Sequence, residues 1–168
     1  MSRGKRGTAL EMFIVVMVVI AALIIVLRVW FFEPVKIEGN SMNDTLITGE
    51  KYFIYKTKNI KNGDIIVFTL NGNENEKYIK RVVAGDGDTM KIEQDELYIN
   101  GDKKKEEYLS EQKKALDEGE VLTEDIEEME IRKGEYYVMG DNRINSIDSR
   151  EFGVITRKDI LGKLIIKE

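Results

Sequence analysis

The first residue of this sequence that could do chemistry is a serine in the stretch EGNSMNDTL, residues 38–46. Ser41 can act as a nucleophile only if a base removes its hydroxyl proton. The chain contains no histidine and no cysteine. A Ser-His-Asp triad, a thiol nucleophile, a thiolate zinc site and a histidine-ligated metal are therefore excluded. The remaining candidate base is a lysine whose pKa is lowered by burial, because desolvation disfavours the ammonium form.

Lys80 is the lysine whose sequence surroundings best suit this role. Most other lysines lie beside other charges in polar turns, as in 103–105 and 113–114, whereas Lys80 lies inside the largely apolar run YIKRVVA, residues 78–84. Side chains alternate along a strand, so Lys80 shares a face with Tyr78, Val82 and Ala84. The alternative is an edge-strand lysine that points to solvent, because lysine is seldom fully buried.

A third group of polar residues forms the segment GDNRINSIDSREFG, residues 140–153. It follows the apolar run EYYVM and brings hydroxyl, carboxylate and guanidinium groups close together along the chain. Taken alone, such a segment is typical of a hydrogen-bonded turn. Its occurrence together with the two preceding motifs makes it a candidate part of the same site.

An apolar segment near the amino terminus is expected to anchor these elements. Residues 12–27 are sixteen residues without a charge, a helical length of about 24 Å. Arg28 and the aromatic group that follows can extend this length to the membrane interface. We therefore predict a transmembrane anchor over residues 12–32. The alternative is a cleaved signal peptide, but no small-x-small cleavage site ends the run.

Charge at the two ends of this segment predicts its orientation. Arg3, Lys5 and Arg6 precede any acidic residue, so the positive-inside rule places residues 1–11 in the cytoplasm and residues 33–168 outside. The net charge of -5 argues against nucleic acid as a partner.

The outer part of the chain is expected to be mainly β. Short β-branched and aromatic runs alternate with Gly, Asn and Asp, which is typical of short antiparallel strands. Residues 103–130 depart from this pattern, because they are rich in Lys and Glu and because 117–130 carry eight acids. We predict that this insertion is a solvated helix or a mobile segment without a chemical role.

Together these motifs resemble the bacterial type I signal peptidases. The resemblance covers nearly the whole chain, from the anchor through SM-x-x-TL, YIKRVVA-x-x-GD and LYING (97–101) to GDN-R-x-x-S-x-DSR-x-FG. It implies an antiparallel β catalytic domain on a single amino-terminal transmembrane helix. It also implies a serine endopeptidase without cofactor or metal, which cuts exported pre-proteins after small-x-small sites. Ser41 would be the nucleophile and Lys80 the general base.

The resemblance also implies roles for other residues and for partners. Ser146 would orient the lysine through a hydrogen bond, Asp148 and Arg150 would brace their loop, and Asp141 and Arg81 would support the site. The substrate-binding positions would be Ile37, Gly39, Met42, Leu46, Tyr78 and Ile79. The implied partners are signal peptides, the lipid bilayer and the secretion translocon.

Three positions depart from the family pattern. Asp44 and Asp86 stand where prolines are usual, and we expect each to form an Asx-turn that partly replaces the fixed φ of proline. Asp44 is expected to face water. Gly39 stands where some members have a serine that helps to bind the oxyanion, which leaves the Ser41 N–H as the expected donor.

Two other functions remain compatible with the sequence. One is a non-catalytic, membrane-tethered β-domain that binds extracellular partners, for which Asp44 and Asp86 are the supporting features. The other is a peptidase dedicated to pilin-like or similar surface substrates.

Overall fold

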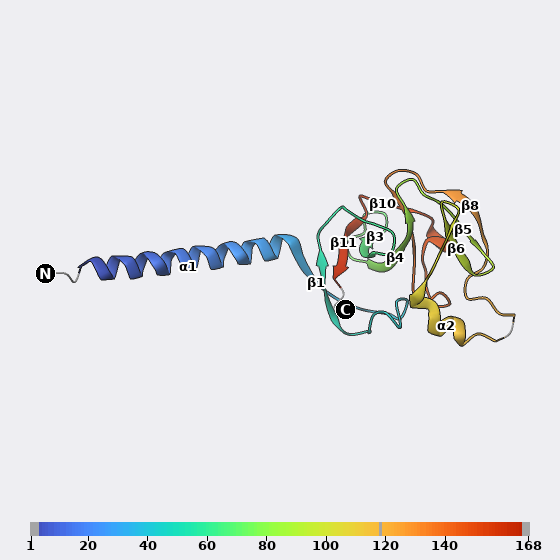
Figure 1. The fold of residues 1–168 in the computed structure, drawn as a ribbon, viewed down its shortest axis with the longest axis horizontal. Coiled ribbons are helices and arrows are strands. Elements are labelled where there is room, and N and C mark those ends of the chain that lie inside the picture. Colours follow the sequence, from blue (N-terminus) through green and yellow to red (C-terminus); the bar gives the residue numbers. More distant parts are fainter. Residues whose placement is uncertain (1–3, 118, 166–168) are drawn as a thin grey trace.

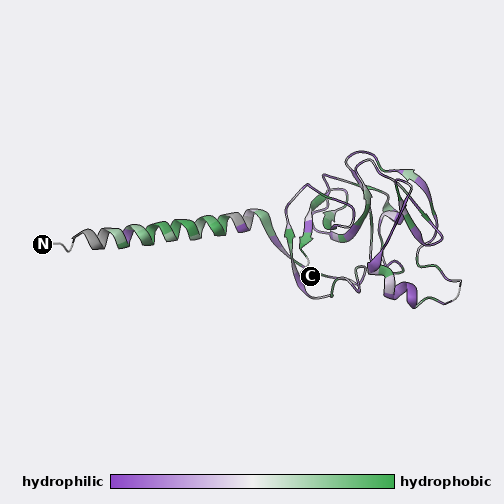
Figure 2. Ribbon diagram, in the orientation of Figure 1, coloured by the Kyte–Doolittle hydropathy of each residue, from purple (hydrophilic) through white to green (hydrophobic). Residues whose placement is uncertain are grey.

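The computed structural model describes residues 4–117 and 119–165, and it begins with a long helix. Helix α1, Gly4–Phe31, extends away from the rest of the chain (Figure 1). Its side chains are exposed over residues 9–26, and most of this stretch is coloured as hydrophobic in Figure 2. Residues Ala9–Val26 are long and apolar enough to cross a membrane, a criterion that a signal sequence also meets. The helix ends one residue before the predicted end of the anchor, because Phe32 already pairs with Tyr55 in a strand.

The rest of the chain is mainly β, as predicted, and every strand pair is antiparallel. The larger sheet has seven strands in the order β1 (Phe32–Lys36), β2 (Lys51–Tyr55), β11 (Ile160–Ile165), β3 (Ile65–Thr69), β4 (Lys77–Gly85), β9 (Glu135–Met139) and β10 (Ile155–Thr156). The smaller sheet has four strands in the order β7 (Asp102–Lys104), β6 (Glu96–Ile99), β5 (Thr89–Glu93) and β8 (Ile126–Glu130).

Strand β4 lies in the interior of the larger sheet, and its side chains contribute to more than one core cluster. It pairs with β3 over residues 77–81 and with β9 over residues 81–85. Residues 77–80 therefore have a neighbouring strand on one side only, but Lys80 is buried, so the alternative that it points to solvent is wrong. The register shifts between Val82 and Ala84, so Val82 packs in one core cluster and Ala84 in another. The predicted alternation of faces consequently fails at Ala84.

Three buried clusters form the core. One lies between the smaller sheet and the β4–β9 pair and includes Met90 and Met139. The second includes Phe68 of β3 and Tyr136 of β9. The third includes Ile37 and Met42, and it lies beneath the loop that connects β1 to β2. That loop is therefore fixed by burial of its apolar side chains.

The charged insertion, residues 103–130, forms the predicted solvated helix over only a short part of its described residues. It contains the short 3-10 helix η1, Glu107–Leu109, and the five-residue helix α2, Ser110–Lys114. Strand β8 pairs with β5. Leu109 and Leu122 are buried, so apolar residues spaced through the charged run attach it to the domain.

Candidate active site

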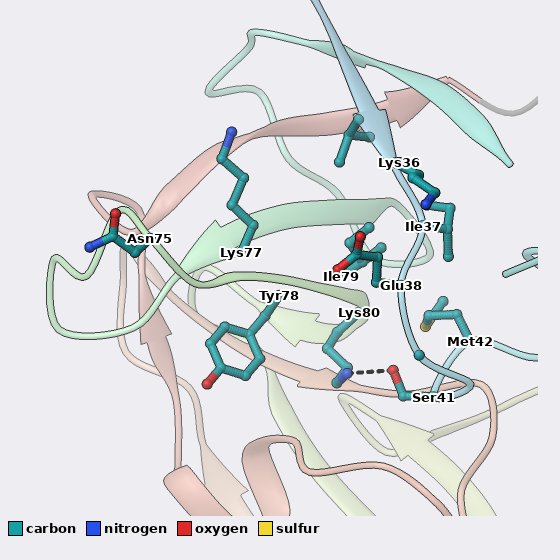
Figure 3. Close-up of a pocket in the computed structure, with 12 residues that line it drawn as sticks. Lys36, Ile37, Glu38, Ser41, Met42, Asn75, Lys77, Tyr78, Ile79 and Lys80 are labelled. Atoms are coloured by element: carbon teal, nitrogen blue, oxygen red, sulfur yellow. Dashed lines mark hydrogen bonds between the residues drawn. The ribbon is translucent and has the colours of Figure 1, made fainter. Parts of the chain in front are cut away.

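The structure brings together the two residues that were predicted to react. Ser41 lies in the loop between β1 and β2, and Lys80 lies on β4. The Lys80 Nζ donates a hydrogen bond of 2.7 Å to the Ser41 Oγ (Figure 3). A nucleophile and a base within this distance can exchange a proton directly.

The electrostatic environment of Lys80 favours its neutral form. The side chain is only 5% exposed. Its pKa is lowered to about 8, chiefly by burial, while the charge of Asp148 opposes this shift and that of Arg150 adds to it. Desolvation dominates because the ammonium ion loses more hydration than the neutral amine. A substantial fraction of Lys80 is therefore neutral near pH 8 and can accept a proton.

The loop after β9 holds the main chain around Ser41. The Asn142 N–H donates to the Ser41 carbonyl oxygen over 3.0 Å. Gly140 packs directly against the same carbonyl group. A Cβ at position 140 would come within 2.5 Å of the Ser41 carbonyl oxygen and within 2.3 Å of the Ser146 Oγ. Only glycine allows this close approach of the two loops.

A buried ion pair joins the two loops to β4. Asp141 is fully buried and accepts hydrogen bonds from the Arg81 Nε over 2.8 Å and Nη2 over 2.6 Å. The Thr45 Oγ1 also donates to Asp141. Arg81 follows Lys80 on β4, and Thr45 belongs to the loop of Ser41, so this network fixes Ser41 relative to Lys80.

Asp148 and Arg150 form a second bidentate pair. Both carboxylate oxygens of Asp148 accept from Arg150 over 2.8 Å, and Asp148 also accepts from the Gly140 N–H over 2.9 Å. Burial alone would raise the pKa of Asp148, but the hydrogen bonds from Arg150 and Gly140 lower it below its ordinary value. Asp148 also caps the short helix α3, Ser149–Phe152. The pair therefore braces the loop that contains Gly140.

Ser146 is close to the site but does not form its expected contact. Its Oγ is buried and has no hydrogen-bond partner among the described residues. The expected hydrogen bond from Ser146 to Lys80 is therefore not formed, and the Ser146 Oγ lies against Gly140 instead.

A cleft of about 440 Å³ leads to the Ser41–Lys80 pair (Figure 3). Five of the six predicted substrate positions line it, namely Ile37, Gly39, Met42, Tyr78 and Ile79. Leu46 does not line this cleft and is only 2% exposed within the core cluster below the loop. Sequence reasoning missed the other lining residues, Val35, Lys36, Glu38, Asn75 and Lys77. Of these, Val35 carried a signal, because it lies two residues before Ile37 in an extended run.

The two aspartates that replace family prolines do not reproduce the backbone of proline. Asp44 has a φ of 74° and Asp86 a φ of 51°, whereas the proline ring fixes φ near about -65°. The expectation that an Asx-turn stands in for the φ of proline is therefore wrong at both positions. The expectation that Asp44 faces water is confirmed, because its side chain is exposed. Gly39 has a φ of 85°, which is strained for a serine.

Within residues 4–117 and 119–165, no cluster of three acidic residues that could hold a metal ion is found. The site thus consists of a serine, a buried lysine and the ion pairs around them.

The chain has an apolar amino-terminal helix and a mainly β domain, and in a cleft of this domain a serine is hydrogen-bonded to a buried lysine. These are the features of an anchored hydrolase that works without histidine. Residues 10–167 match the family model described as "Signal peptidase, peptidase S26". The chain belongs to this family.

Individual relatives agree with this assignment. Signal peptidase I T of Bacillus subtilis (strain 168) is 42% identical over 170 residues, which cover 96% of this chain and 86% of that protein. Signal peptidase I of Bacillus licheniformis is 39% identical over 168 residues, covering 96% and 89% respectively. The crystal structure of a signal peptidase I from Enterococcus faecalis V583 superposes with a TM-score of 0.59 at 32% identity, covering 63% of this chain and 97% of that one. The resemblance and the fold class predicted from the sequence are thereby confirmed.

The close approach at Gly140 leads to a testable prediction. Gly140→Ala is expected to lower kcat/KM at least about tenfold per folded molecule, because the new Cβ displaces the Ser41 main chain and small displacements of reacting groups are costly. Peptide cleavage by the purified full chain in detergent measures the effect. Gly162→Ala is the matched control, since its Cβ would meet the Tyr55 carbonyl oxygen at 2.4 Å, between β11 and β2. It should lower the melting temperature while kcat/KM per folded molecule stays near wild type. Equal kcat/KM values for the two variants would contradict the role assigned to Gly140.

Proposed function

We propose that this chain is a membrane-anchored serine endopeptidase that removes signal peptides from exported pre-proteins after small-x-small sites. The observation that carries this proposal is the 2.7 Å hydrogen bond between Ser41 and Lys80 at the end of the cleft. The names of the relatives, which are signal peptidases, supply the substrate class.

The proposed reaction uses Lys80 in both half-reactions. Neutral Lys80 takes the proton of Ser41, and the Oγ attacks the carbonyl carbon of the residue before the scissile bond, called P1. The Ser41 N–H is the proposed donor to the oxyanion. The Lys80 ammonium then gives its proton to the departing α-amino group of the mature protein. Lys80 next removes a proton from water, and the water oxygen attacks the acyl-enzyme carbonyl carbon. The Lys80 ammonium then returns this proton to the Ser41 Oγ as the ester bond breaks, and the signal peptide leaves with a new carboxylate.

The sheet offers two free edges for an extended substrate. β1 pairs with β2 on one side only, and residues 77–80 of β4 pair with β3 but not with β9. Both strands run toward the catalytic pair, and the cleft lies between them. A substrate strand can therefore add to either edge through main-chain hydrogen bonds. We call this space the substrate slot.

The slot also accounts for small residues at alternating positions. In an extended substrate, P1 and P3 point to the same side. The side chains that line the slot include Ile37, Met42 and Ile79, which are buried or half-buried and already packed in the core cluster below. A bulky P1 or P3 side chain would have to displace packed core atoms.

The anchor is proposed to place this site at the outer surface of the cytoplasmic membrane. Lys5 and Arg6 belong to α1 and Arg3 lies outside the described residues, and together they favour a cytoplasmic amino terminus. The lipid bilayer and the translocon are the proposed partners. Substrate and enzyme would then meet within a thin layer, which raises their effective concentration.

Cleavage of a matched pair of precursors tests the proposal. Full-length protein in lipid vesicles is mixed with a precursor ending its signal peptide in Ala-x-Ala, and with the same precursor carrying Leu at P1. The Ala precursor should be cut after P1, as read by mass spectrometry, and the Leu precursor at least about tenfold more slowly. No cleavage of the Ala precursor, or equal cleavage of both, would contradict the proposal.

The non-catalytic alternative gains no support from the residues that suggested it. Asp44 and Asp86 are both exposed, and their side chains bond to Gln112 and to the Gly134 N–H rather than to Lys80.

A further inference from the structure

The substrate slot closes at the catalytic pair. β9 pairs with β4 from Arg81 onward, so an added substrate strand cannot continue along β4 beyond Lys80. The chain then leaves β9 and packs Gly140 against the Ser41 carbonyl group. The part of the substrate that follows the scissile bond must therefore leave the sheet and pass over the two loops that meet at Ser41.

A second hollow lies on these loops. It has a volume of about 380 Å³ and is bounded by the loop after Ser41, the loop after β9 and the segment of the insertion around α2. In Figure 1, α2 lies beside the loop that follows β1. The lining residues that matter here are Asn43, Asp44, Leu116, Glu120, Asn142 and Ile144. The hollow begins two residues after the nucleophile.

Hydrogen bonds join the wall of this hollow to the catalytic loops. Asn142 donates through its N–H to the Ser41 carbonyl oxygen over 3.0 Å and through its Nδ2 to the Asn40 carbonyl oxygen over 3.1 Å. Gln112 of α2 donates to the Asp141 carbonyl oxygen over 2.9 Å and to the Asp44 carboxylate over 3.3 Å. The opposite walls are therefore held at fixed positions relative to Ser41.

A buried network attaches the insertion to the same loop. The Arg143 side chain is almost fully buried and forms an ion pair with Glu106 of the insertion. It also donates to the Thr123 Oγ1 over 3.0 Å and to the Gly140 carbonyl oxygen over 3.2 Å. Breaking a buried pair of this kind leaves an uncompensated charge, so the insertion is firmly docked. The hollow is thus part of the folded domain.

The lining groups define which peptide segment fits. Asp44 and Glu120 are exposed, and they are the two charged residues among those that line the hollow. Ile144 is 70% exposed and presents an apolar surface beside them. Two carboxylates near the departing segment attract basic side chains and repel acidic ones.

We propose that this hollow binds the first residues of the mature chain, on the leaving-group side of the scissile bond, and that Asp44 and Glu120 make it favour basic over acidic residues there. The inference rests on the proposed function, because it assigns the other half of the same substrate. It also gives the charged insertion a part in substrate selection.

A series of precursors tests this assignment. Three precursors share the same Ala-x-Ala signal peptide and differ only in the second mature residue, which is Lys, Gln or Glu. The full-length enzyme is held in phosphatidylcholine vesicles, so that membrane charge does not contribute. We expect kcat/KM to be highest for Lys and lowest for Glu, with a ratio of about five at about 50 mM NaCl that shrinks at about 0.5 M NaCl because salt screens exposed charges.

Variants then locate the source of this preference. Asp44→Asn should reduce the Lys/Glu ratio to about two, and Asp44→Lys should reverse it. Glu128→Gln on β8 changes the net charge by the same amount as Asp44→Asn, at an exposed position outside both clefts, and should keep the wild-type ratio. Each ratio is measured within one variant, so partial loss of folded enzyme cancels.

The outcomes separate this inference from the proposed function. Equal kcat/KM for the three precursors, all of them cleaved, would overturn the leaving-side assignment and leave signal-peptide cleavage standing. A Lys/Glu ratio that persists unchanged in both Asp44 variants would place the preference elsewhere and also overturn it. Failure to cleave any of the three precursors would contradict both proposals.

Discussion

Replacing Ser41 with alanine or Lys80 with methionine is expected to lower kcat/KM for precursor cleavage by at least about 10³-fold. Ser41→Ala removes the oxygen that is proposed to form the acyl-enzyme, and Lys80→Met removes the proposed base, whose Nζ lies 2.7 Å from that oxygen. The double variant should lose no more activity than either single variant, because the two residues act in one step. Initial rates with the full chain in detergent measure all three.

The stability of Lys80→Met distinguishes loss of catalysis from loss of folding. The pKa of Lys80 falls from 10.5 to about 8 in the folded protein. Below pH 8 the lysine is protonated in both the folded and unfolded states, so the folded state carries the full cost of the buried charge. This cost diminishes between pH 8 and pH 10.5, as the folded protein releases its proton first. Lys80→Met should therefore be more stable than wild type at pH 7, and this advantage should shrink as the pH rises.

A lysine outside the site serves as the control for this comparison. Lys91→Met on β5 replaces a partly exposed lysine paired with Glu93, so it should change neither the rate nor the pH dependence of stability appreciably. Near-normal turnover by Ser41→Ala or by Lys80→Met would exclude the assigned pair. Equal stability changes in Lys80→Met and Lys91→Met would show that Lys80 does not carry a buried charge.

The sequence contains enough information to identify the residues that are proposed to react, but it does not predict their geometry. The absence of histidine and cysteine left lysine as the candidate base for Ser41, and the apolar run around Lys80 together with the family motif distinguished it from most other lysines. Its burial, however, depends on the pairing of β4 with β3 and on the loop of Ser41 that packs beside it. Pairing among strands that are distant along the chain cannot be read from local alternation, which also failed at the shifted register before Ala84.

The family motifs point to Arg81 and Asp141 as supporting residues, but neither the motifs nor any local pattern predicts their contacts. Arg81 and Asp141 are 60 residues apart and Thr45 and Asp141 are 96 apart, so no local rule joins them. Leu46 was assigned to substrate binding, yet an apolar residue next to a site can equally face the core, and this one does. The positive φ of Asp44 could not be predicted from the sequence either, because aspartate adopts both signs of φ more readily than most residues.

In the charged insertion, composition and the spacing of apolar residues give different indications. Its many Lys and Glu residues suggested a solvated segment, whereas Ile126 and Met129 pack against the core cluster of the smaller sheet. A few apolar residues are enough to dock a segment whose charged residues face water. Glu106 also pairs with Arg143, so one of the charges that suggested exposure is itself buried.

The rate of precursor cleavage is expected to rise about 50-fold between pH 6 and pH 8. Only neutral Lys80 can take the proton of Ser41, and its pKa is about 8. Below that value the neutral fraction falls about tenfold for each pH unit. A plot of kcat/KM against pH reports this pKa in the free enzyme, and it should level off above about pH 9 while the protein stays folded.

Arg150→Gln tests the electrostatic origin of this midpoint. Arg150 lowers the pKa of Lys80, whereas Asp148 raises it. Removing the guanidinium leaves the negative charge of Asp148 without its bidentate partner, so the ammonium form of Lys80 gains stability. The midpoint of the pH profile should therefore move upward, which a purely structural role of Arg150 would not produce. A midpoint near the ordinary lysine value in the wild-type enzyme, or a downward shift in Arg150→Gln, would contradict a base whose pKa is set by burial and by these two neighbours.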